Sequence, residues 1–335
     1  MTHEQFEIFS NQAVAACAVL YFLAFLAQLA AYVSRPRAAV VAPAARSRVG
    51  EGDVAVEAPP AEPPASQRTE MFVRLALALT AFAALVHLAA LVTRGLAADP
   101  ARVPWGNMYE FTLTATFVVV ALYLLMHRRF ALAWMAPVIT LFVLAVLMVD
   151  VLVLYEPVIP LRDALQSPWL VIHVVAAILA TGAFTMGGMV SALYLVKERA
   201  LSRGGGQTGY LARVPSLVGL DRLAYRWHAF AFPVWTFAAL IAGPIWAQYA
   251  WGRYWGWDPK EVWAFITWVV YAAYLHARTT AGWKGRNAAI LALVGTATLW
   301  FNFIGINYFS SSSQHSYANA QSVLRDEGPA WARSD

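Results

Sequence analysis

Residues 251–261 combine aromatic rings and charges in a pattern that could hold a flat ligand. The stretch reads Trp251-Gly252-Arg253-Tyr254-Trp255-Gly256-Trp257-Asp258-Pro259-Lys260-Glu261. Rings at this density form a polarisable surface that can stack on a planar ligand larger than one ring. Trp and Tyr also gather wherever a membrane protein meets water, but that belt is spread over several helix ends and not over one loop. The stretch therefore indicates a binding surface.

Histidine is the second informative residue type, because its copies lie at different expected depths. His173 and His315 are expected on the side of the Trp-rich loop, and His276 about 22 Å deeper at 1.5 Å per helical residue. A six-coordinate haem iron takes two imidazoles from opposite faces, so its ligands must share one depth. His173 and His315 meet that condition beside the aromatic loop, although His315 alone could equally be a solvated histidine. A histidine at membrane depth usually marks a site. His276 is too deep to share an iron with the other two histidines, so a metal bound there would need a partner from elsewhere.

The elements that hold these residues must be membrane-spanning helices. The chain is 60% hydrophobic and only 13% charged, a balance that soluble domains of this length do not have. We expect an all-α, polytopic membrane protein with about eight transmembrane helices. The first run has an acidic flank and no cleavage-site pattern, which indicates a span and not a signal peptide. The apolar runs lie at 8–33, 71–93, 107–126, 130–154, 169–196, 227–248, 261–281 and 287–308.

The Lys and Arg residues of the loops orient these helices. The loops at 34–70, 127–130, 197–226 and 277–286 carry sixteen of them, and the opposite loops carry seven. The positive-inside rule makes the first set cytoplasmic. The Trp-rich loop and both termini are then extracytoplasmic, and we expect a multi-pass protein of the cell membrane. The net charge of +5 follows from this asymmetry and indicates no nucleic-acid partner.

Composition divides the chain into four parts. Residues 1–33 form the first transmembrane helix, and 34–70, rich in Ala, Pro, Glu and Arg, form a disordered cytoplasmic linker that separates it from the other seven. Residues 71–320 form a seven-helix core with the Trp-rich outer loop at 246–261, and 321–335 form an outer tail. The single cysteine, Cys17, allows neither an internal disulfide nor a thiol relay.

Several segments resemble one family of membrane proteins. The Trp-rich stretch resembles the "WWD" signature of the haem-handling proteins. Other segments, between about residues 70 and 320, resemble the CcsA/ResC branch of System II cytochrome c biogenesis. These are Asn107-Met108-Tyr109-Glu110, Ser167-Pro168-Trp169 with His173, Trp263 to Arg278, Gly282-Trp283-Lys284-Gly285, and Gly305-Ile306-Asn307 with His315.

The resemblance implies haem delivery and covalent haem attachment to apocytochrome c on the outer face of the membrane. The chain would be one subunit of a cytochrome c haem lyase or synthase, and haem b would be its transported substrate. The implied partners are a CcsB/ResB-type (Ccs1-like) membrane subunit, an apocytochrome c with a Cys-x-x-Cys-His motif, and thiol-reducing proteins. The last are needed because Cys17 is the only thiol of this chain.

The same resemblance implies roles for individual residues. His173 and His315 would ligate an outer haem iron and His276 an inner one, with a partner histidine from the companion subunit. No residue is assigned a catalytic role. The aromatic and acidic residues of the loop would position haem, and its two cations are candidate propionate partners, although either could be a solvated charge. The predicted haem-contacting residues are Trp251, Arg253, Tyr254, Trp255, Trp257, Asp258 and Lys260.

The residues leave two other functions open. One is a haem exporter that passes haem to a separate chaperone, which the presence of His276 disfavours. The other is a polytopic transporter of a non-haem solute, in which the Trp-rich loop is an interfacial belt. A visible haem spectrum of the purified protein separates this second function from the others.

Overall fold

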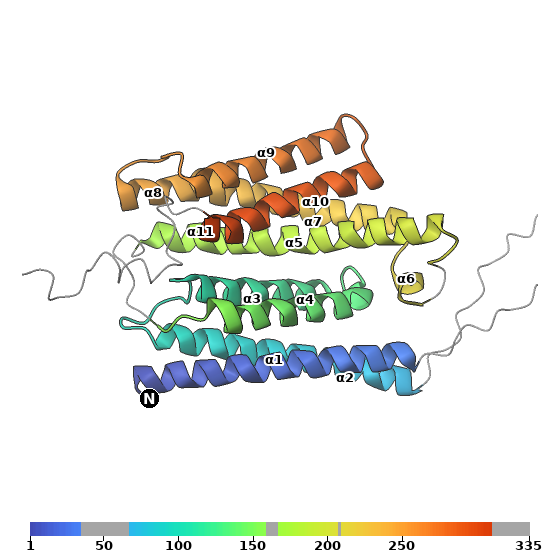
Figure 1. Cartoon of the computed structure of the whole chain (residues 1–335), viewed down its shortest axis with the longest axis horizontal. Helices are drawn as coiled ribbons and strands as arrows, with labels where there is room; N and C mark the ends of the chain where they lie inside the picture. Colours follow the sequence, from blue (N-terminus) through green and yellow to red (C-terminus); the bar gives the residue numbers. More distant parts are fainter. Residues whose placement is uncertain (35–66, 159–166, 207–208, 310–335) are drawn as a thin grey trace, which may run out of the picture.

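The computed structural model describes residues 1–34, 67–158, 167–206 and 209–309. Within these ranges the regular structure is helical (Figure 1). His315, the tail 321–335 and most of the linker lie outside the described residues. The main helices are α1 (His3–Val33), α2 (Gln67–Leu96), α3 (Met108–Met126), α4 (Ala136–Val149), α5 (Pro168–Ser202), α6 (Gly209–Arg213), α7 (Leu217–Phe237), α8 (Gly243–Trp251), α9 (Pro259–Thr279), α10 (Arg286–Trp300) and α11 (Ile306–Phe309).

Short 3-10 and π-helical turns extend several of these helices. A 3-10 turn, Leu132–Met135, precedes α4, and the π turn Asp150–Leu154 follows it. The π turn Ala238–Ala242 joins α7 to α8, and the π turn Phe301–Gly305 joins α10 to α11. The last two of these turns each connect two named helices without a break in the helical structure.

The prediction of an all-α, polytopic membrane protein is confirmed. Among the described residues, seven helical segments are long and apolar enough to cross a membrane. The predicted span 261–281 corresponds to α9, which is not one of the seven. Polar residues at its two ends, among them Lys260 and Arg278, lower its mean hydropathy. The predicted count of eight therefore depends on α9.

The helices alternate in direction and define two ends of the bundle (Figure 1). We call the end where α8 stops at Trp251 and α9 begins at Pro259 the tryptophan end. The other end, where α1 stops at Val33 and α2 begins at Gln67, is the linker end. α2 begins within the stretch predicted as linker. The sixth apolar segment also starts earlier than expected, at Leu217 and not near residue 227.

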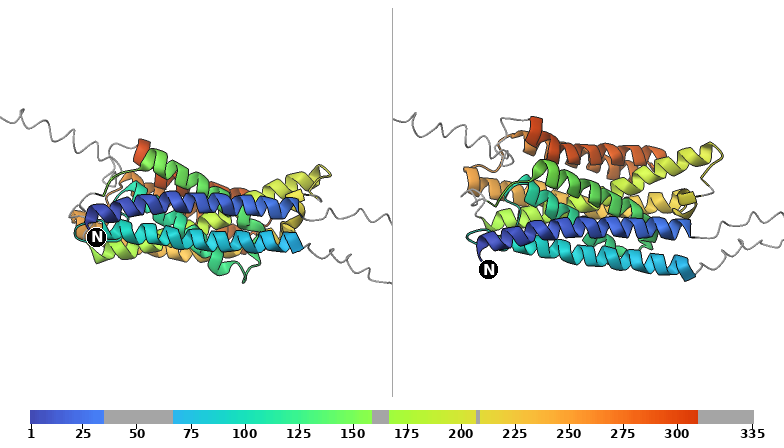
Figure 2. Two further views of the ribbon diagram at one scale, coloured as in Figure 1. Left: turned by 90° about the horizontal axis from the view of Figure 1, so that it is seen from below. Right: turned by 60° about the horizontal axis from the view of Figure 1, so that its bottom comes forward.

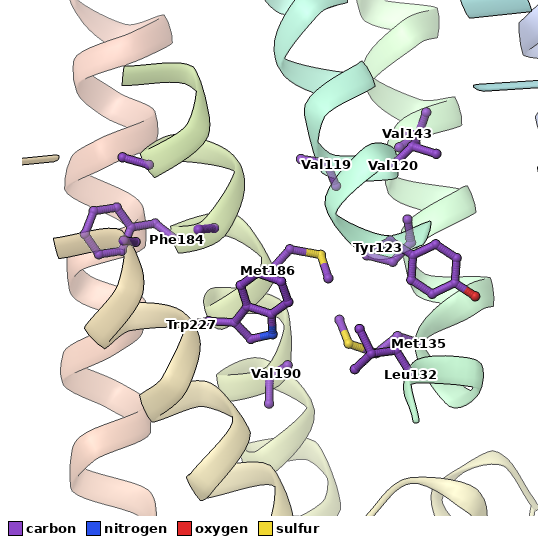
Figure 3. Close-up of a cluster of buried hydrophobic side chains, with 14 of the residues drawn as sticks. Val119, Val120, Tyr123, Leu132, Met135, Val143, Phe184, Met186, Val190 and Trp227 are labelled. Carbon is purple, nitrogen blue, oxygen red and sulfur yellow. The ribbon is translucent and has the colours of Figure 1, made fainter. Parts of the chain in front are cut away.

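The bundle has two groups of helices. α1 to α4 pack on one another, and α5 packs with α7 and α10, which in turn packs with α9. The contact of α3 with α5 joins the groups. Figure 3 shows side chains at this junction, with Met186 of α5 pointing toward Tyr123 of α3. These side chains belong to the main buried cluster.

The first helix packs against α2 and α4, although the stretch predicted as linker separates it from them in the sequence. Figure 2 shows α1 and α2 side by side along the bundle. The buried face of α1 consists largely of small residues, including Ser10, Ala13 and Cys17, which let two helix backbones approach closely in a membrane. Ser10 Oγ donates to the Ala90 carbonyl at 2.8 Å. α1 is thus part of the helix bundle.

Candidate functional site

His173 lies near the start of α5, at the tryptophan end. Ser167 caps this helix by accepting the Trp169 N–H, and Pro168 follows at the first helical position. The His173 Nδ1 lies 2.9 Å from the Ala238 carbonyl oxygen. A carbonyl can only accept, so Nδ1 carries the proton, and the lone pair of the neutral ring is on Nε2. Metal-ligating histidines are fixed by this kind of hydrogen bond.

The backbone around Ala238 is shaped to receive this ring. Ala238 begins the π turn, and its carbonyl also accepts the N–H of Gly243, five residues on. A Cβ at Gly243 would lie 3.1 Å from two atoms of the His173 ring, so glycine is what allows the close approach. Trp246, one turn further, stacks on the His173 ring with centroids 5.9 Å apart and planes 12° apart. These contacts fix the orientation of the imidazole.

A cavity opens beside His173, which we call the tryptophan-end cavity. Its empty volume, including its mouth, is about 1250 Å³. Its wall is formed by the beginning of α3, the first part of α5, the π turn Ala238–Ala242 with α8, the start of α9, and the π turn Phe301–Gly305. Most of the lining is apolar or aromatic. The aromatic lining residues are Trp105, Phe111, Trp235, Trp246, Tyr254, Trp255 and Phe303.

Several polar atoms in this lining are buried and have no hydrogen-bond partner among the residues that the structure describes. They are the Trp255 Nε1, the Asn107 Nδ2 and the Asn302 Oδ1. A buried polar group without a partner is costly. A mostly apolar cavity with a few converging polar groups is the usual form of a small-molecule site. The lining thus fits a large planar ligand with polar groups at its edge.

The structure separates the seven predicted loop residues into those that face the cavity and those that do not. Tyr254, Trp255 and Lys260 line it. Trp251 packs on the lining residue Trp246, with ring centroids 4.8 Å apart. Trp257 is 71% exposed and lies in the left-handed backbone region, with φ of 56°.

The remaining two loop residues shape the loop itself. Asp258 is the N-cap of α9 and forms a capping box with Glu261, as the spacing of these two residues indicates. Glu261 Oε2 also accepts the N–H of Gly256 at 2.8 Å, so one carboxylate closes the loop twice. The Arg253 guanidinium lies against Gly256, where a Cβ would be 2.5 Å from it. The guanidinium thus covers the loop backbone at Gly256.

Lys260 is tied to the opposite wall of the cavity. Its Nζ donates to Asn307 Oδ1 at 2.9 Å. The Asn307 amide in turn donates to the Phe303 carbonyl and lies 2.9 Å from the Met108 sulfur. This chain of contacts links α9, α11 and α3 around the cavity and places an ammonium group in its wall.

A buried charge network supports the third wall, and nothing in the sequence pattern indicated it. Glu110 is fully buried and pairs with Arg94 at 3.3 Å and with Arg102 at 2.6 Å. The same carboxylate accepts the N–H of Gly106 at 2.8 Å. Residues 105–108 line the cavity. Glu110 therefore holds the segment that forms this wall.

His276 lies outside this cavity. It is an exposed residue three positions before the end of α9, at the linker end, and its Nδ1 is 3.2 Å from the Thr280 hydroxyl. It is sixteen residues beyond Lys260, or about 24 Å along the helix. Within the described residues, no group of three or more His, Cys, Asp or Glu side chains could hold a metal ion. The tryptophan-end cavity thus offers His173 as its histidine among the described residues.

Two other histidines are buried in the helix packing. His87 Nε2 lies 3.0 Å from the Leu113 carbonyl oxygen, and its Nδ1 lies 3.4 Å from the Tyr21 hydroxyl. His228 packs against Phe184 and Tyr271 and lies 3.5 Å from the Ser191 hydroxyl. Neither of these two histidines lines the tryptophan-end cavity.

Comparison with known proteins gives one consistent result. A family model described as "Cytochrome C assembly protein" matches residues 105–313. The chain is similar to the protein "Cytochrome c biogenesis protein CcsA" of Trieres chinensis, at 34% identity over 247 residues, 64% of this chain and 77% of that one. The protein of the same name from Guillardia theta is 40% identical over 172 residues, 47% of this chain and 56% of that one.

A similar solved structure is that of "Cytochrome c Heme Lyase CcmF". It aligns with a TM-score of 0.56 and 20% identity, over 91% of this chain and 49% of that one. At this identity the likeness concerns the fold alone. The chain spans about half the length of that lyase and of the Guillardia theta relative.

Proposed function

Because this chain belongs to the CcsA-type cytochrome c assembly proteins, we propose that it holds haem and presents it for covalent attachment to apocytochrome c. It acts as one membrane subunit of a cytochrome c synthase. The observation that carries the proposal is the His173 ring, fixed by the Ala238 carbonyl and by Trp246 at the edge of a large aromatic cavity. A neutral imidazole held in this way suits an axial haem ligand.

In this proposal haem b lies in the tryptophan-end cavity with the His173 Nε2 on its iron. His315, which lies outside the described residues, supplies the second imidazole. Trp255 and Tyr254 contact the ring face, and Lys260 binds a propionate. Trp251 supports the cavity through its packing on Trp246, and Trp257 lies outside the cavity. Asp258 fixes the loop as the cap of α9, and Arg253 is a second candidate for binding a propionate. Two imidazoles on one iron keep oxygen from it.

The attachment step uses the thiols of the substrate. The Cys-x-x-Cys-His segment of apocytochrome c docks at the tryptophan end, and its histidine replaces one of the two ligands. Each cysteine thiol would then add across one haem vinyl group: the S–H bond and the π bond of the vinyl break, and a C–S bond and a C–H bond form. The contribution of this chain is orientation of haem against the two thiols. Cys17, buried in α1, has no part in it.

The proposal places the tryptophan end outside the cell membrane, together with both termini. The sixteen-to-seven distribution of Lys and Arg over the loops supports this orientation. His276 is then near the cytoplasmic surface, and its exposure suits a ligand completed by a histidine of a CcsB/ResB-type subunit. Thiol-reducing proteins keep the apocytochrome cysteines reduced.

One experiment tests the outer site. Cells that carry His173→Ala should fail to mature cytochrome c, and the purified complex should lose the part of its Soret absorbance that comes from haem at the outer site. Added imidazole should partly restore maturation, since it can occupy the vacated position on iron. The control is His3→Ala, which removes an exposed histidine at the same end of the bundle. Normal maturation and haem content in His173→Ala without imidazole would show that the ligand assignment is wrong.

A second experiment tests the orientation. Reporter fusions after residue 255, in the Trp-rich loop, and after residue 205, between α5 and α6, should report opposite compartments. Activity of both on the same side of the membrane would contradict the proposed topology, and with it the extracytoplasmic attachment site.

A further inference from the structure

A second cavity lies at the linker end, among helices of the other group. α1, α2, the end of α3, the turn before α4, and α6 line it, and its empty volume including its mouth is about 1000 Å³. We call it the linker-end cavity. It is separate from the tryptophan-end cavity, with which it shares no lining residue. Its aromatic lining residues are Tyr32, Tyr123, Trp134 and Tyr210.

Two nitrogen-bearing side chains of this lining carry buried atoms without a hydrogen-bond partner among the described residues. The His127 Nδ1 and the Trp134 Nε1 are buried, and neither has a hydrogen-bond partner in the described part of the chain. Trp134 can only donate, whereas a neutral imidazole can both donate and accept. Such groups are rare in natural structures and call for a ligand or water that the protein alone does not supply.

His127 is in the neutral form that binds metals. It is the C-cap of α3, outside the spanning segment, and packs edge-on against Tyr123 with ring centroids 5.3 Å apart. Burial and the neighbouring Arg128 lower the pKa of its imidazole from 6.5. The ring is therefore uncharged at neutral pH and keeps a lone pair for a ligand.

The cavity also carries a positive charge at its rim. The Arg213 guanidinium lies over the Tyr32 ring, 4.3 Å from its centroid, and donates to the Tyr32 carbonyl. Arg213 belongs to α6, and the neighbouring Tyr210 hydroxyl donates to the Trp134 carbonyl at 2.8 Å. α6 is thus attached to the turn before α4 and forms one wall. A guanidinium beside aromatic walls suits a flat ligand with an acidic edge.

We propose that the linker-end cavity is a second binding site for haem, distinct from the sites of His173 and His276. The proposal rests on the proposed function, because it takes haem to be the cargo of this chain. In this site an imidazole nitrogen of His127 ligates the iron, the aromatic residues contact the porphyrin, and Arg213 binds a propionate. An anionic phospholipid could satisfy Arg213, but it offers nothing that a neutral imidazole coordinates, so the residue set favours haem.

The test first removes the three histidines that are proposed as ligands elsewhere in the chain. The full chain with His173→Ala, His276→Ala and His315→Ala is purified and titrated with ferric haem, and the Soret band is followed. We expect this variant to bind haem still. Adding His127→Ala should abolish the shifted Soret band, and Arg213→Gln should weaken binding about tenfold. The matched control is Arg129→Gln, an exposed arginine of the neighbouring turn that does not line the cavity.

A second variant guards against a folding defect. Ala133 is exposed and lines the cavity, so Ala133→Trp should fill the space without disturbing the bundle. We expect weaker haem binding at an unchanged unfolding temperature. Haem binding that is indifferent to His127→Ala and to Ala133→Trp would overturn the proposal. So would a phospholipid that copurifies with the chain and is lost in Arg213→Gln while haem does not bind.

Failure of this inference can be told from failure of the proposed function. If the unaltered chain binds haem through His173 but the triple variant binds none, the linker-end site does not exist and the proposed function stands. If neither the unaltered chain nor the triple variant binds haem, the proposed function itself fails.

Discussion

The two ends of the α5–α11 group present histidine in opposite ways. At the tryptophan end His173 is held by a main-chain hydrogen bond and a stacked indole beside a cavity. At the linker end His276 is exposed on α9 and contacts a threonine of its own helix end. A ligand that is fixed before binding loses little freedom on binding. The first site is therefore largely built within this chain, whereas the second needs a surface from another molecule.

The strongest way to break the tryptophan end is to remove the charge beneath its wall. In Glu110→Ala the buried Arg94 loses this carboxylate and keeps its pair with Glu7 at 3.4 Å, and loss of one partner of a buried pair costs about 3–5 kcal/mol. We expect a fall in the unfolding temperature of the purified protein and a loss of bound haem. The control is Glu70→Ala, which removes an exposed pair with Arg74 that is worth about 0–1 kcal/mol. Equal effects of the two changes would mean that the network does not support the wall.

A smaller change should displace the His173 ring alone. In Gly243→Ala the new methyl group would lie 3.1 Å from the ring, and overpacking of this kind costs about 1–3 kcal/mol. We expect roughly tenfold weaker haem retention, measured by the Soret band during dilution. Gly205→Ala, in an open turn, is the comparison. Unchanged retention in Gly243→Ala would show that the ring position does not matter for binding.

The two indoles of the loop should differ. Trp255 lines the cavity, so Trp255→Ala should weaken haem retention by a few-fold to about tenfold through lost ring contact. Trp257→Ala changes an exposed ring, and we expect haem retention close to that of the unaltered protein. The measurement is haem content after purification of both variants. If Trp257→Ala loses more haem than Trp255→Ala, the exposed face and not the cavity holds the ligand.

At the linker end, a change of His276 should have the smallest effect on stability of all these variants. His276→Ala replaces an exposed side chain, so the free energy of unfolding should change by less than about 0.5 kcal/mol. Haem content should fall only when the companion subunit is present during purification. A fall that is equally large for the chain alone would mean that His276 binds haem without a partner surface.

The sequence predicted those features that are local in the chain. Helix spans follow from runs of apolar residues, and the capping box of Asp258 and Glu261 follows from their spacing. The placement of His173 near the Trp-rich loop followed from helix lengths. The helix spans and the capping box depend on residues within a few turns of one another, and the depth of His173 depends on its position within one helix.

The features that it did not predict depend on tertiary contacts or on backbone detail. Arg94 and Glu110 belong to different helices, and only their packing pairs them. Trp257 is exposed and adopts a left-handed backbone conformation just before the cap of α9. The spacing of residues in the sequence does not reveal this conformation. The linker-end cavity joins α6 to α1, far apart in the chain. The spacing of residues around His127 therefore could not indicate that this side chain lines a cavity.

The acceptor of the His173 hydrogen bond is a main-chain carbonyl in a π turn. No side-chain replacement at position 238 can delete that atom, so the orientation of the imidazole can survive drift in the residues of this turn. A π turn amounts to one residue inserted into an α-helix. Loss of a single residue between 238 and 242 would restore the ordinary helix and rotate everything after it by about 100° at 3.6 residues per turn. The hydrogen bond to His173 is thus insensitive to the side chain at position 238 and sensitive to a deletion within the turn.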